Sequence, residues 1–149
     1  MEKNLEVVYE VLKIKQIVAE TEIPRVTIKS PNDAVKIIQD EIGNEDREIF
    51  LVLCLNTKNQ VNAMHRCHVG SINSSIVHPR EVMKSAILNN AASIIVAHNH
   101  PSYDTTPSRE DIEVTKRLVE AGKIMGIELL DHVIVSPTSY TSLKEKGYC

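Results

Sequence analysis

A continuous apolar run gives the strongest strand signal in the chain. Residues 48–55 read Glu-Ile-Phe-Leu-Val-Leu-Cys-Leu, and only the first of them is polar. A run of this length without alternation is typical of a strand that is covered on both faces, so it predicts a central strand. The polar residues 56–60 predict a turn, after which residues 61–69 return as the second strand of a hairpin.

The first helix signal lies at residues 30–43. Ser30 suits the N-cap, Pro31 the first helical position and Asp33 the first turn, where an acid is favourable. The helix is predicted to end near Gly43. Its apolar residues recur at helical spacing and predict a buried face of Val35, Ile38 and Ile42.

Two further helices follow from start signals and the apolar period. One opens at His-Pro-Arg-Glu, residues 78–81, and the other spans residues 108–125. Gly126 closes the latter helix, and Ile127 can make the apolar contact that accompanies such a cap. The predicted inward faces are Val82, Met83, Ala86 and Ile87 in the former, and Thr115, Leu118, Ala121, Gly122 and Met125 in the latter.

The remaining segments complete an alternation of helices and strands. Residues 93–97 and 131–135 predict short strands, and residues 7–19 predict a strand because they are rich in β-branched residues. Residues 142–149 form a polar tail, and no repeat or linker divides residues 1–149, which predict a single domain. The alternation favours an α/β class, an α+β mixed sheet flanked by helices.

Composition narrows the function classes. The 149 residues carry a net charge of -3 with no basic run, so nucleic acid is not the partner that the charge predicts. Cys54, Cys67 and Cys149 show neither disulfide density nor metal spacing, which favours the cytoplasm. No apolar run reaches the roughly 18 residues of a membrane span, so neither anchor nor signal peptide is predicted.

The polar chemistry is concentrated after the strand at residues 93–97. His98 and His100 are two residues apart, so both imidazoles can point to one side as the strand ends. Asp111 lies in the first turn of the following helix, which a short loop can fold back toward them. Two histidines and one carboxylate leave the fourth position of tetrahedral zinc to water, which favours catalysis.

Such a site would need two more groups. Zinc lowers the pKa of bound water from about 15.7 to about 7, and a nearby carboxylate that is not a ligand could serve as the general base. Ser108, beside the helix N-terminus, could donate a hydrogen bond to a developing oxyanion. The plainer alternatives stay open: histidines at a strand end are commonly structural, and Ser-x-x-Asp is also a helix capping box.

The pattern H-x-H-x7-S-x-x-D resembles the motif of JAMM (MPN+) metallopeptidases, and more closely that of their RadC-like branch. The similar runs are His-Pro-Arg-Glu at 78–81, His-Asn-His-Pro-Ser at 98–102, Pro-Ser-Arg-Glu-Asp at 107–111, Leu-Leu-Asp-His at 129–132 and Ser-Leu-Lys-Glu-Lys-Gly at 142–147. The resemblance implies a JAMM/MPN-like, cytidine-deaminase-like layered fold. It also implies Zn2+ held by His98, His100 and Asp111, with Ser108 as the oxyanion donor.

The family's upstream glutamate matches Glu48, although Glu45 lies close by. Two features depart from the family. Tyr103 stands where the family usually has glycine, and the N-terminal helix-hairpin-helix region of full-length RadC proteins is missing from this sequence. A role in DNA metabolism that rests on that region is therefore not carried over.

Other polar groups have ordinary interpretations. His65, Cys67 and His68 cannot all share one side of a strand, so an exposed hairpin is favoured over a metal site. The pair Asp131–His132 suits either a pair that orients a metal ligand or a charge and hydrogen-bond pair at the start of a strand.

The leading hypothesis is a zinc-dependent hydrolase of peptide or isopeptide amide bonds, acting on a peptide or protein substrate through water activated by Glu48. The alternatives are a non-catalytic RadC-type binding protein in DNA repair or mobile-element metabolism, and a metal-dependent nuclease. A single carboxylate ligand suits amide hydrolysis better than phosphodiester cleavage, which commonly uses carboxylate-rich two-metal sites.

Overall fold

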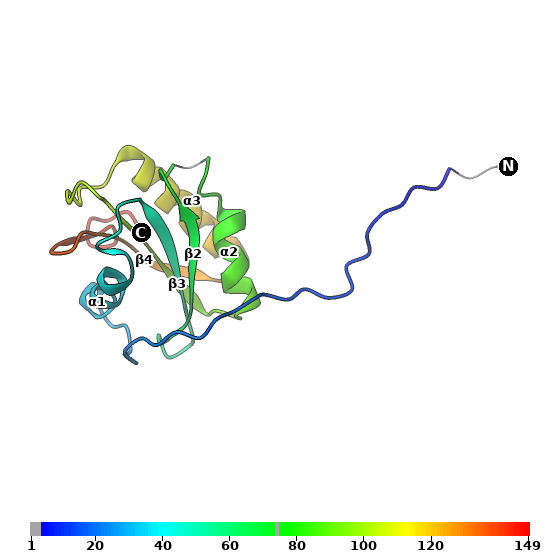
Figure 1. Cartoon of the computed structure of the whole chain (residues 1–149), viewed down its shortest axis with the longest axis horizontal. Helices are drawn as coiled ribbons and strands as arrows, with labels where there is room; N and C mark the ends of the chain where they lie inside the picture. The colour runs from blue at the N-terminus through cyan, green and yellow to red at the C-terminus, as the bar shows by residue number, and fades with distance from the viewer. Residues whose placement is uncertain (1–3, 74) are drawn as a thin grey trace.

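The protein folds around a five-stranded mixed sheet flanked by three helices (Figure 1). The computed structural model describes residues 4–73 and 75–149. The elements follow one another as α1 (Pro31–Ile42), β1 (Ile49–Leu55), β2 (Val61–Val69), α2 (Pro79–Leu88), β3 (Ser93–Asn99), α3 (Arg109–Met125), β4 (Glu128–Val135) and β5 (Tyr140–Ser142). The sheet order is β2-β1-β3-β4-β5, with β3 and β4 parallel and the other neighbours antiparallel. The predicted mixed α/β class is confirmed.

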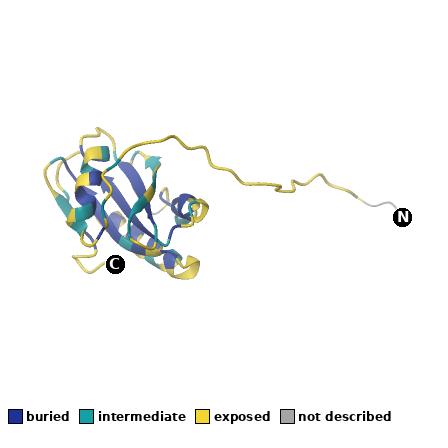
Figure 2. Cartoon of the chain, turned by 90° about the horizontal axis from the view of Figure 1, so that it is seen from below, coloured by how far each residue is buried: buried dark blue, intermediate teal, exposed yellow. Residues whose placement is uncertain are grey.

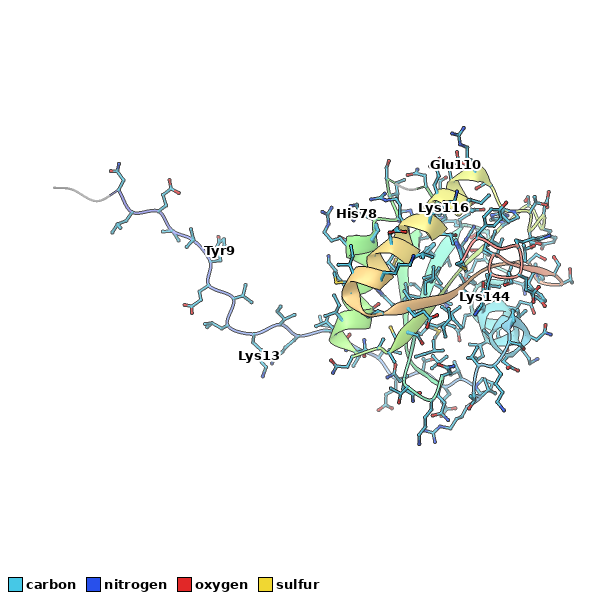
Figure 3. All side chains as sticks on the ribbon, turned by 180° about the vertical axis from the view of Figure 1, so that it is seen from behind. Tyr9, Lys13, His78, Glu110, Lys116 and Lys144 are labelled. Carbon is cyan, nitrogen blue, oxygen red and sulfur yellow. The ribbon has the colours of Figure 1, made fainter. Side chains whose placement is uncertain are left out.

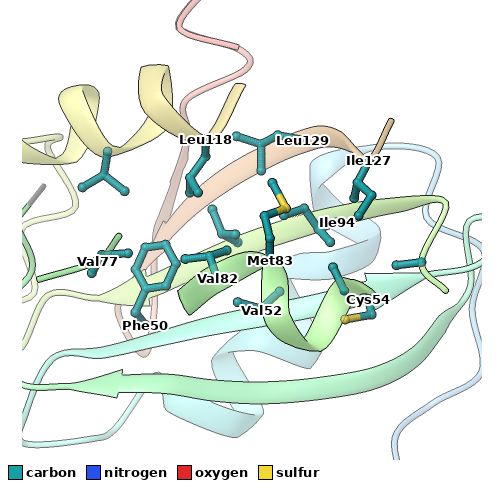
Figure 4. Packing of buried hydrophobic residues seen from close by; sticks show 14 of the residues in the cluster. Phe50, Val52, Cys54, Val77, Val82, Met83, Ile94, Leu118, Ile127 and Leu129 are labelled. Carbon is teal, nitrogen blue, oxygen red and sulfur yellow. The ribbon is translucent and has the colours of Figure 1, made fainter. Parts of the chain in front are cut away.

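Alternate residues of β1 face opposite helical layers. Phe50 and Val52 pack with residues of α2 and α3 (Figure 4), whereas Leu51 and Leu53 pack with α1. All seven residues of β1 are buried, and the sheet forms the dark interior of Figure 2. The central strand predicted from the apolar run is therefore confirmed. Because β3 is buried in the same way, neighbouring side chains at its end also point into different layers.

The predicted starts and ends of helices α1 and α3 are confirmed. The Asp33 carboxylate accepts a hydrogen bond of 3.2 Å from the backbone N–H of Ser30, which fixes the first turn of α1. The three apolar residues predicted to face inward from α1 are all buried. At the end of α3, Gly126 has a φ of 69°, in the left-handed region that suits glycine, and Ile127 is buried behind it.

Two residues of the predicted inward faces are exposed instead. Ile87 of α2 is half exposed, because Val82, Met83 and Ala86 already fill the contact between this helix and the sheet. Met125 is also half exposed. The chain turns back after it, and the backbone N–H of Ile127 donates to the carbonyl of Gly122, so Ile127 takes the core position instead.

The strand predicted at residues 7–19 is wrong. These residues are extended and exposed. Tyr9 and Lys13 stand clear of the body of the protein in Figure 3, and Gln16 meets the body through side-chain hydrogen bonds of 3.2 Å with Asn89. A strand needs a neighbour to satisfy its backbone, and within the described part of the chain no strand pairs with this segment. The chain first meets the sheet at an isolated antiparallel bridge between Thr27 and Gln60.

The C-terminal part is more ordered than a polar tail. β4 begins at Glu128, three residues before the predicted start, and β5 was not predicted. Leu143 is fully buried and anchors the segment that follows β5. Within residues 4–73 and 75–149, no helix has both the length and the apolar character needed to cross a membrane.

Candidate metal centre

Three donor side chains meet where β3 leaves the sheet. His98 is the second-to-last residue of the buried strand β3, His100 follows the end of that strand, and Asp111 lies in the first turn of α3. His98 and Asp111 are buried, whereas the His100 side chain is 14% exposed. The group therefore has two buried members and one that reaches the surface.

The spacing of the three groups fits a tetrahedral metal ion. The Nε2 atoms of His98 and His100 lie 3.0 Å apart. Oδ1 of Asp111 lies 3.1 Å from Nε2 of His98, and Oδ2 lies 3.2 Å from Nε2 of His100. Ligand atoms bound at about 2.0–2.1 Å in a tetrahedron stand about 3.3 Å apart. These three residues could hold a metal ion with shifts of only a few tenths of an ångström.

The carboxylate of Asp111 is stabilised in its ionised form. Burial by itself would raise the pKa of Asp111, but hydrogen bonds from His100 and His98 outweigh it and hold the pKa well below its usual range. Burial acts to lower the pKa of His100, but its hydrogen bonds to Asp111 and to the Asp104 carbonyl outweigh it, so this pKa lies above its usual value. The centre thus presents a fixed negative charge to a cation.

His100 is held from behind by the loop that follows it. Its Nδ1 atom lies 2.7 Å from the backbone carbonyl oxygen of Asp104. A carbonyl can only accept a hydrogen bond, so Nδ1 carries the proton and donates it. Nε2 is thereby the atom directed at Asp111.

The two members of the Asp131–His132 pair have separate partners. Nε2 of His132 lies 2.8 Å from Nδ1 of His98, so His132 stands directly behind a member of the donor group. Burial and the neighbouring His98 hold the pKa of His132 well below its usual range. The Asp131 carboxylate instead accepts hydrogen bonds from the Ser142 hydroxyl and the Lys144 backbone N–H. Of the pair, only His132 contacts a candidate metal ligand from behind, which is one of the two roles that the sequence left open.

Glu48 precedes β1 at the same end of the sheet. Phe50 pairs with His98 across antiparallel strands, and this register carries the chain toward Glu48 beside the end of β3. Oε2 of Glu48 accepts a hydrogen bond of 2.9 Å from the backbone N–H of Ile72. The negative charge of Glu48 contributes to raising the pKa of His100, so the two groups interact.

Ser108 caps α3 through the same carboxylate that completes the donor group. Its hydroxyl accepts a hydrogen bond of 3.1 Å from the backbone N–H of Asp111, and its own N–H donates to Oδ2 of Asp111 at 2.8 Å. The capping box and the candidate metal ligand are therefore one structural unit. Ser108 is exposed beside the centre, and its role as an oxyanion donor stays a prediction.

Asn99 is a polar residue whose importance the sequence did not reveal. It is 1% exposed, and its side-chain oxygen accepts a hydrogen bond of 2.7 Å from the backbone N–H of Ile49. Its amide nitrogen donates to the backbone carbonyls of Arg47 at 2.9 Å and Glu45 at 3.2 Å. These bonds flank Glu48 on both sides. The available signal was a lone amide in a buried strand, because buried amides need partners.

The polar residues of β2 do not form a second metal centre. Among the residues that the structure describes, the three donors at the end of β3 are the only group with metal-ligand geometry. His65 is exposed, and Cys67 and His68 are half-buried, in agreement with an ordinary hairpin. Burial raises the pKa of Cys67 to about 11, with a smaller contribution from the charge of Glu81.

Tyr103 occupies a backbone position that favours glycine. Its φ is 69°, and its N–H donates to the carbonyl of His100 at 2.9 Å in a tight turn. The side chain is 62% exposed. The tyrosine therefore adds bulk on the surface of the loop that follows the two histidines.

Comparisons with known proteins agree with the fold. The sequence profile of the RadC-like JAB domain matches residues 28–148. A UPF0758 protein of Desulforamulus reducens is 55% identical over 123 residues, which is 83% of this chain and 54% of the relative. A UPF0758 protein of Caldanaerobacter subterraneus is 51% identical over 134 residues, 90% of this chain and 58% of the relative. The chain thus spans little more than half the length of these relatives.

Proposed function

The chain belongs to the family of RadC-like JAB domains, and from this membership we propose that it is a zinc-dependent hydrolase of amide bonds, peptide or isopeptide. The observation that carries the proposal is the spacing of His98, His100 and Asp111, whose ligand atoms lie 3.0–3.2 Å apart. Two imidazoles and one carboxylate form a donor set that suits zinc. The partial exposure of His100 gives a substrate access from one side.

A zinc ion held by these residues would supply Lewis acidity at neutral pH. The proton transfers fall to Glu48. Its Oε2 atom is occupied by the N–H of Ile72, so we assign the proton from the attacking water to Oε1. Glu48 then delivers that proton to the leaving amine, as a general base that becomes a general acid.

Ser108 is the proposed donor to the substrate oxygen. Its hydroxyl oxygen accepts a bond from the Asp111 N–H, so the hydroxyl proton itself is directed elsewhere. From an exposed N-cap this proton can reach a substrate carbonyl oxygen as negative charge develops on it. The position at the start of α3 adds the positive end of the helix dipole.

The donor set favours amide hydrolysis over phosphodiester cleavage. It holds one carboxylate, whereas nucleases commonly use two metal ions bridged by several carboxylates. The net charge of -3 supports a peptide or protein substrate rather than a nucleic acid. Three free cysteines support work in the reducing cytoplasm. The chain covers only about half the length of its relatives. The activity and partners of the whole protein are therefore proposals as well.

A substrate panel tests the proposal. Zinc-loaded wild type, Glu48→Gln and the matched control Glu45→Gln would be assayed on peptide and isopeptide substrates. Wild type and Glu45→Gln are expected to cleave, and Glu48→Gln is expected to lose about 10²–10⁴-fold in kcat/KM while it retains zinc. Equal turnover by Glu48→Gln would refute the role of Glu48. No turnover by zinc-loaded wild type across the panel would refute the hydrolase and support a binding protein.

A further inference from the structure

A buried chain of hydrogen bonds continues behind the metal centre. Nδ1 of His98 lies 2.8 Å from Nε2 of His132, and Nδ1 of His132 lies 2.6 Å from the hydroxyl of Thr115. The Thr115 hydroxyl lies 2.8 Å from the backbone carbonyl oxygen of Asp111. The chain begins at one candidate ligand and ends on the backbone of another. His98, His132 and Thr115 are all fully buried, so water does not compete for these bonds.

The carbonyl at the end of this chain sets the direction of every bond in it. A carbonyl has no proton, so Thr115 must donate its single hydroxyl proton to Asp111. The Thr115 oxygen can then only accept from Nδ1–H of His132. A neutral imidazole with its proton on Nδ1 has its lone pair on Nε2.

The lone pair of His132 faces His98. His132 is fully buried, its ring contacts Phe50, His98 and Thr115, and the nearest acid, Asp111, bonds to His98 and not to this ring. An unpaired buried cation would be costly, so the ring is neutral and accepts at Nε2. The proton of this bond therefore belongs to Nδ1 of His98. Nε2 of His98, which lies 3.1 Å from Asp111 and donates to it in the metal-free protein, is then the ring atom that would exchange its proton for a metal ion.

Packing holds both rings in this orientation. The Phe50 ring stacks on His98 with centroids 6.2 Å apart and meets His132 edge-on at 5.7 Å. Phe50 is itself buried among Val77, Val82 and the other residues of the core in Figure 4. A ring flip of either histidine would break a buried hydrogen bond inside a close-packed core.

We infer that His132 and Thr115 are positioning residues that fix His98 as its Nδ1–H tautomer and so direct its Nε2 lone pair at the metal. This inference rests on the proposed metal binding but concerns different residues. Histidine ligands commonly donate their other N–H to a carboxylate or a carbonyl. Nδ1–H of His100 donates in this way to the Asp104 carbonyl, whereas Nδ1–H of His98 donates to the neutral imidazole of His132. The imidazole orients the ligand without adding a second buried negative charge.

The tautomers can be read directly by NMR. Long-range ¹H–¹⁵N correlation spectra of the ¹⁵N-labelled, metal-free full chain report which ring nitrogen carries the proton. The expected result is a protonated Nδ1 and an unprotonated Nε2 for His132, assigned by loss of its signals in His132→Gln. A protonated Nε2 on His132 would overturn the inference. This measurement needs neither zinc nor a substrate, so its outcome is independent of the proposed function.

Zinc affinity gives the second readout. His132→Leu removes the Nε2 acceptor and fills the buried position with an apolar side chain. We expect zinc affinity to fall about 10–100-fold. His132→Gln returns an amide oxygen near the position of Nε2 and is expected to recover part of that loss. Wild-type affinity in a folded His132→Leu protein would contradict the inference. If wild type itself binds no zinc, the proposed function fails while the tautomer result still stands.

A milder pair of variants covers the case in which His132→Leu does not fold. Thr115→Val removes only the hydroxyl, whereas the control Thr115→Ser retains it. Thr115→Val is expected to bind zinc more weakly than Thr115→Ser, because His132 can then adopt either tautomer. Equal zinc affinity of these two variants, with equal thermal stability, would exclude a role for Thr115.

Discussion

The side-chain oxygen of Asn99 accepts a hydrogen bond of 2.7 Å from the backbone N–H of Ile49. Asn99 stands between the two histidines in the sequence, but its side chain points into the opposite layer of the fold. There it holds the backbone on both sides of Glu48. One short segment at the end of β3 thus supports the metal ligands on one face and the strand that carries the proposed base on the other.

Removal of the Asn99 amide should uncouple metal binding from catalysis. Asn99→Ala leaves the N–H of Ile49 buried without its partner and removes the hydrogen bond to the carbonyl of Arg47, which costs about 1–3 kcal/mol of stability. We expect zinc affinity close to wild type and a fall in kcat, because Glu48 loses its fixed position. Asn62→Ala, on the exposed side of β2, is the control for stability. Unchanged kcat in Asn99→Ala would contradict the positioning role.

The two roles of Ser108 can be separated by substitution. Ser108→Ala should lower the free energy of unfolding by about 0.5–2 kcal/mol, because the cap of α3 is lost. Ser108→Gly should cost only a few tenths of a kcal/mol, since glycine is tolerated at the N-cap. Both variants lack the hydroxyl, so both should lose about 10²–10³-fold in kcat if Ser108 is the oxyanion donor. If urea unfolding shows that Ser108→Gly is as stable as wild type and its turnover is also normal, Ser108 has the capping role alone.

The cysteines should react slowly with alkylating reagents at neutral pH. Burial raises the pKa of Cys67 and of Cys149 to about 11, and it also raises the pKa of Cys54. A raised pKa keeps the thiol protonated, so the thiolate fraction stays small and grows about tenfold per pH unit up to that value. Iodoacetamide labelling at pH 8, followed by mass spectrometry, should be at least about tenfold slower than in urea-unfolded protein. Equal rates in the folded and unfolded protein would show that the thiols are accessible and that burial does not raise their pKa.

The chain should bind nucleic acid weakly if at all. Its net charge is -3, and binding to a phosphate backbone depends on clusters of lysine and arginine that release counterions. A gel-shift assay with single- and double-stranded DNA at physiological salt is expected to show no complex at micromolar protein. A tight complex that dissociates as salt is raised would favour the RadC-type binding alternative over the hydrolase.

Local signals in the sequence predicted much of the fold. The apolar run of β1, the Pro31 start of α1 and the Gly126 end of α3 each depend on a few neighbouring residues. The strand predicted at residues 7–19 failed for the opposite reason. Strand propensity states only that a segment suits a sheet, and pairing is decided by chain far away in the sequence. β5 has three residues, too few to show a period.

The candidate site divides in the same way. The donors follow from spacing, because His98 and His100 lie two residues apart at a strand end and Asp111 lies in a helix start. The residues that support these donors and Glu48 do not follow from spacing. His132 reaches His98 only because β3 and β4 are parallel neighbours, and Asn99 reaches Ile49 only because β1 and β3 pair. Such partners depend on the order of strands in the sheet, and local patterns in a single sequence do not reveal that order.

The zinc content of purified protein tests the central claim most directly. Wild type, Asp111→Ala and the control Glu110→Ala would be purified without chelator, checked for folding by circular dichroism, and analysed for metal by mass spectrometry. Glu110 lies on the outer side of the first turn of α3 (Figure 3), next to Asp111 but outside the donor group. Wild type and Glu110→Ala are expected to carry about one zinc per chain, and Asp111→Ala far less. One zinc per chain in folded Asp111→Ala would show that the metal site has been assigned to the wrong residues.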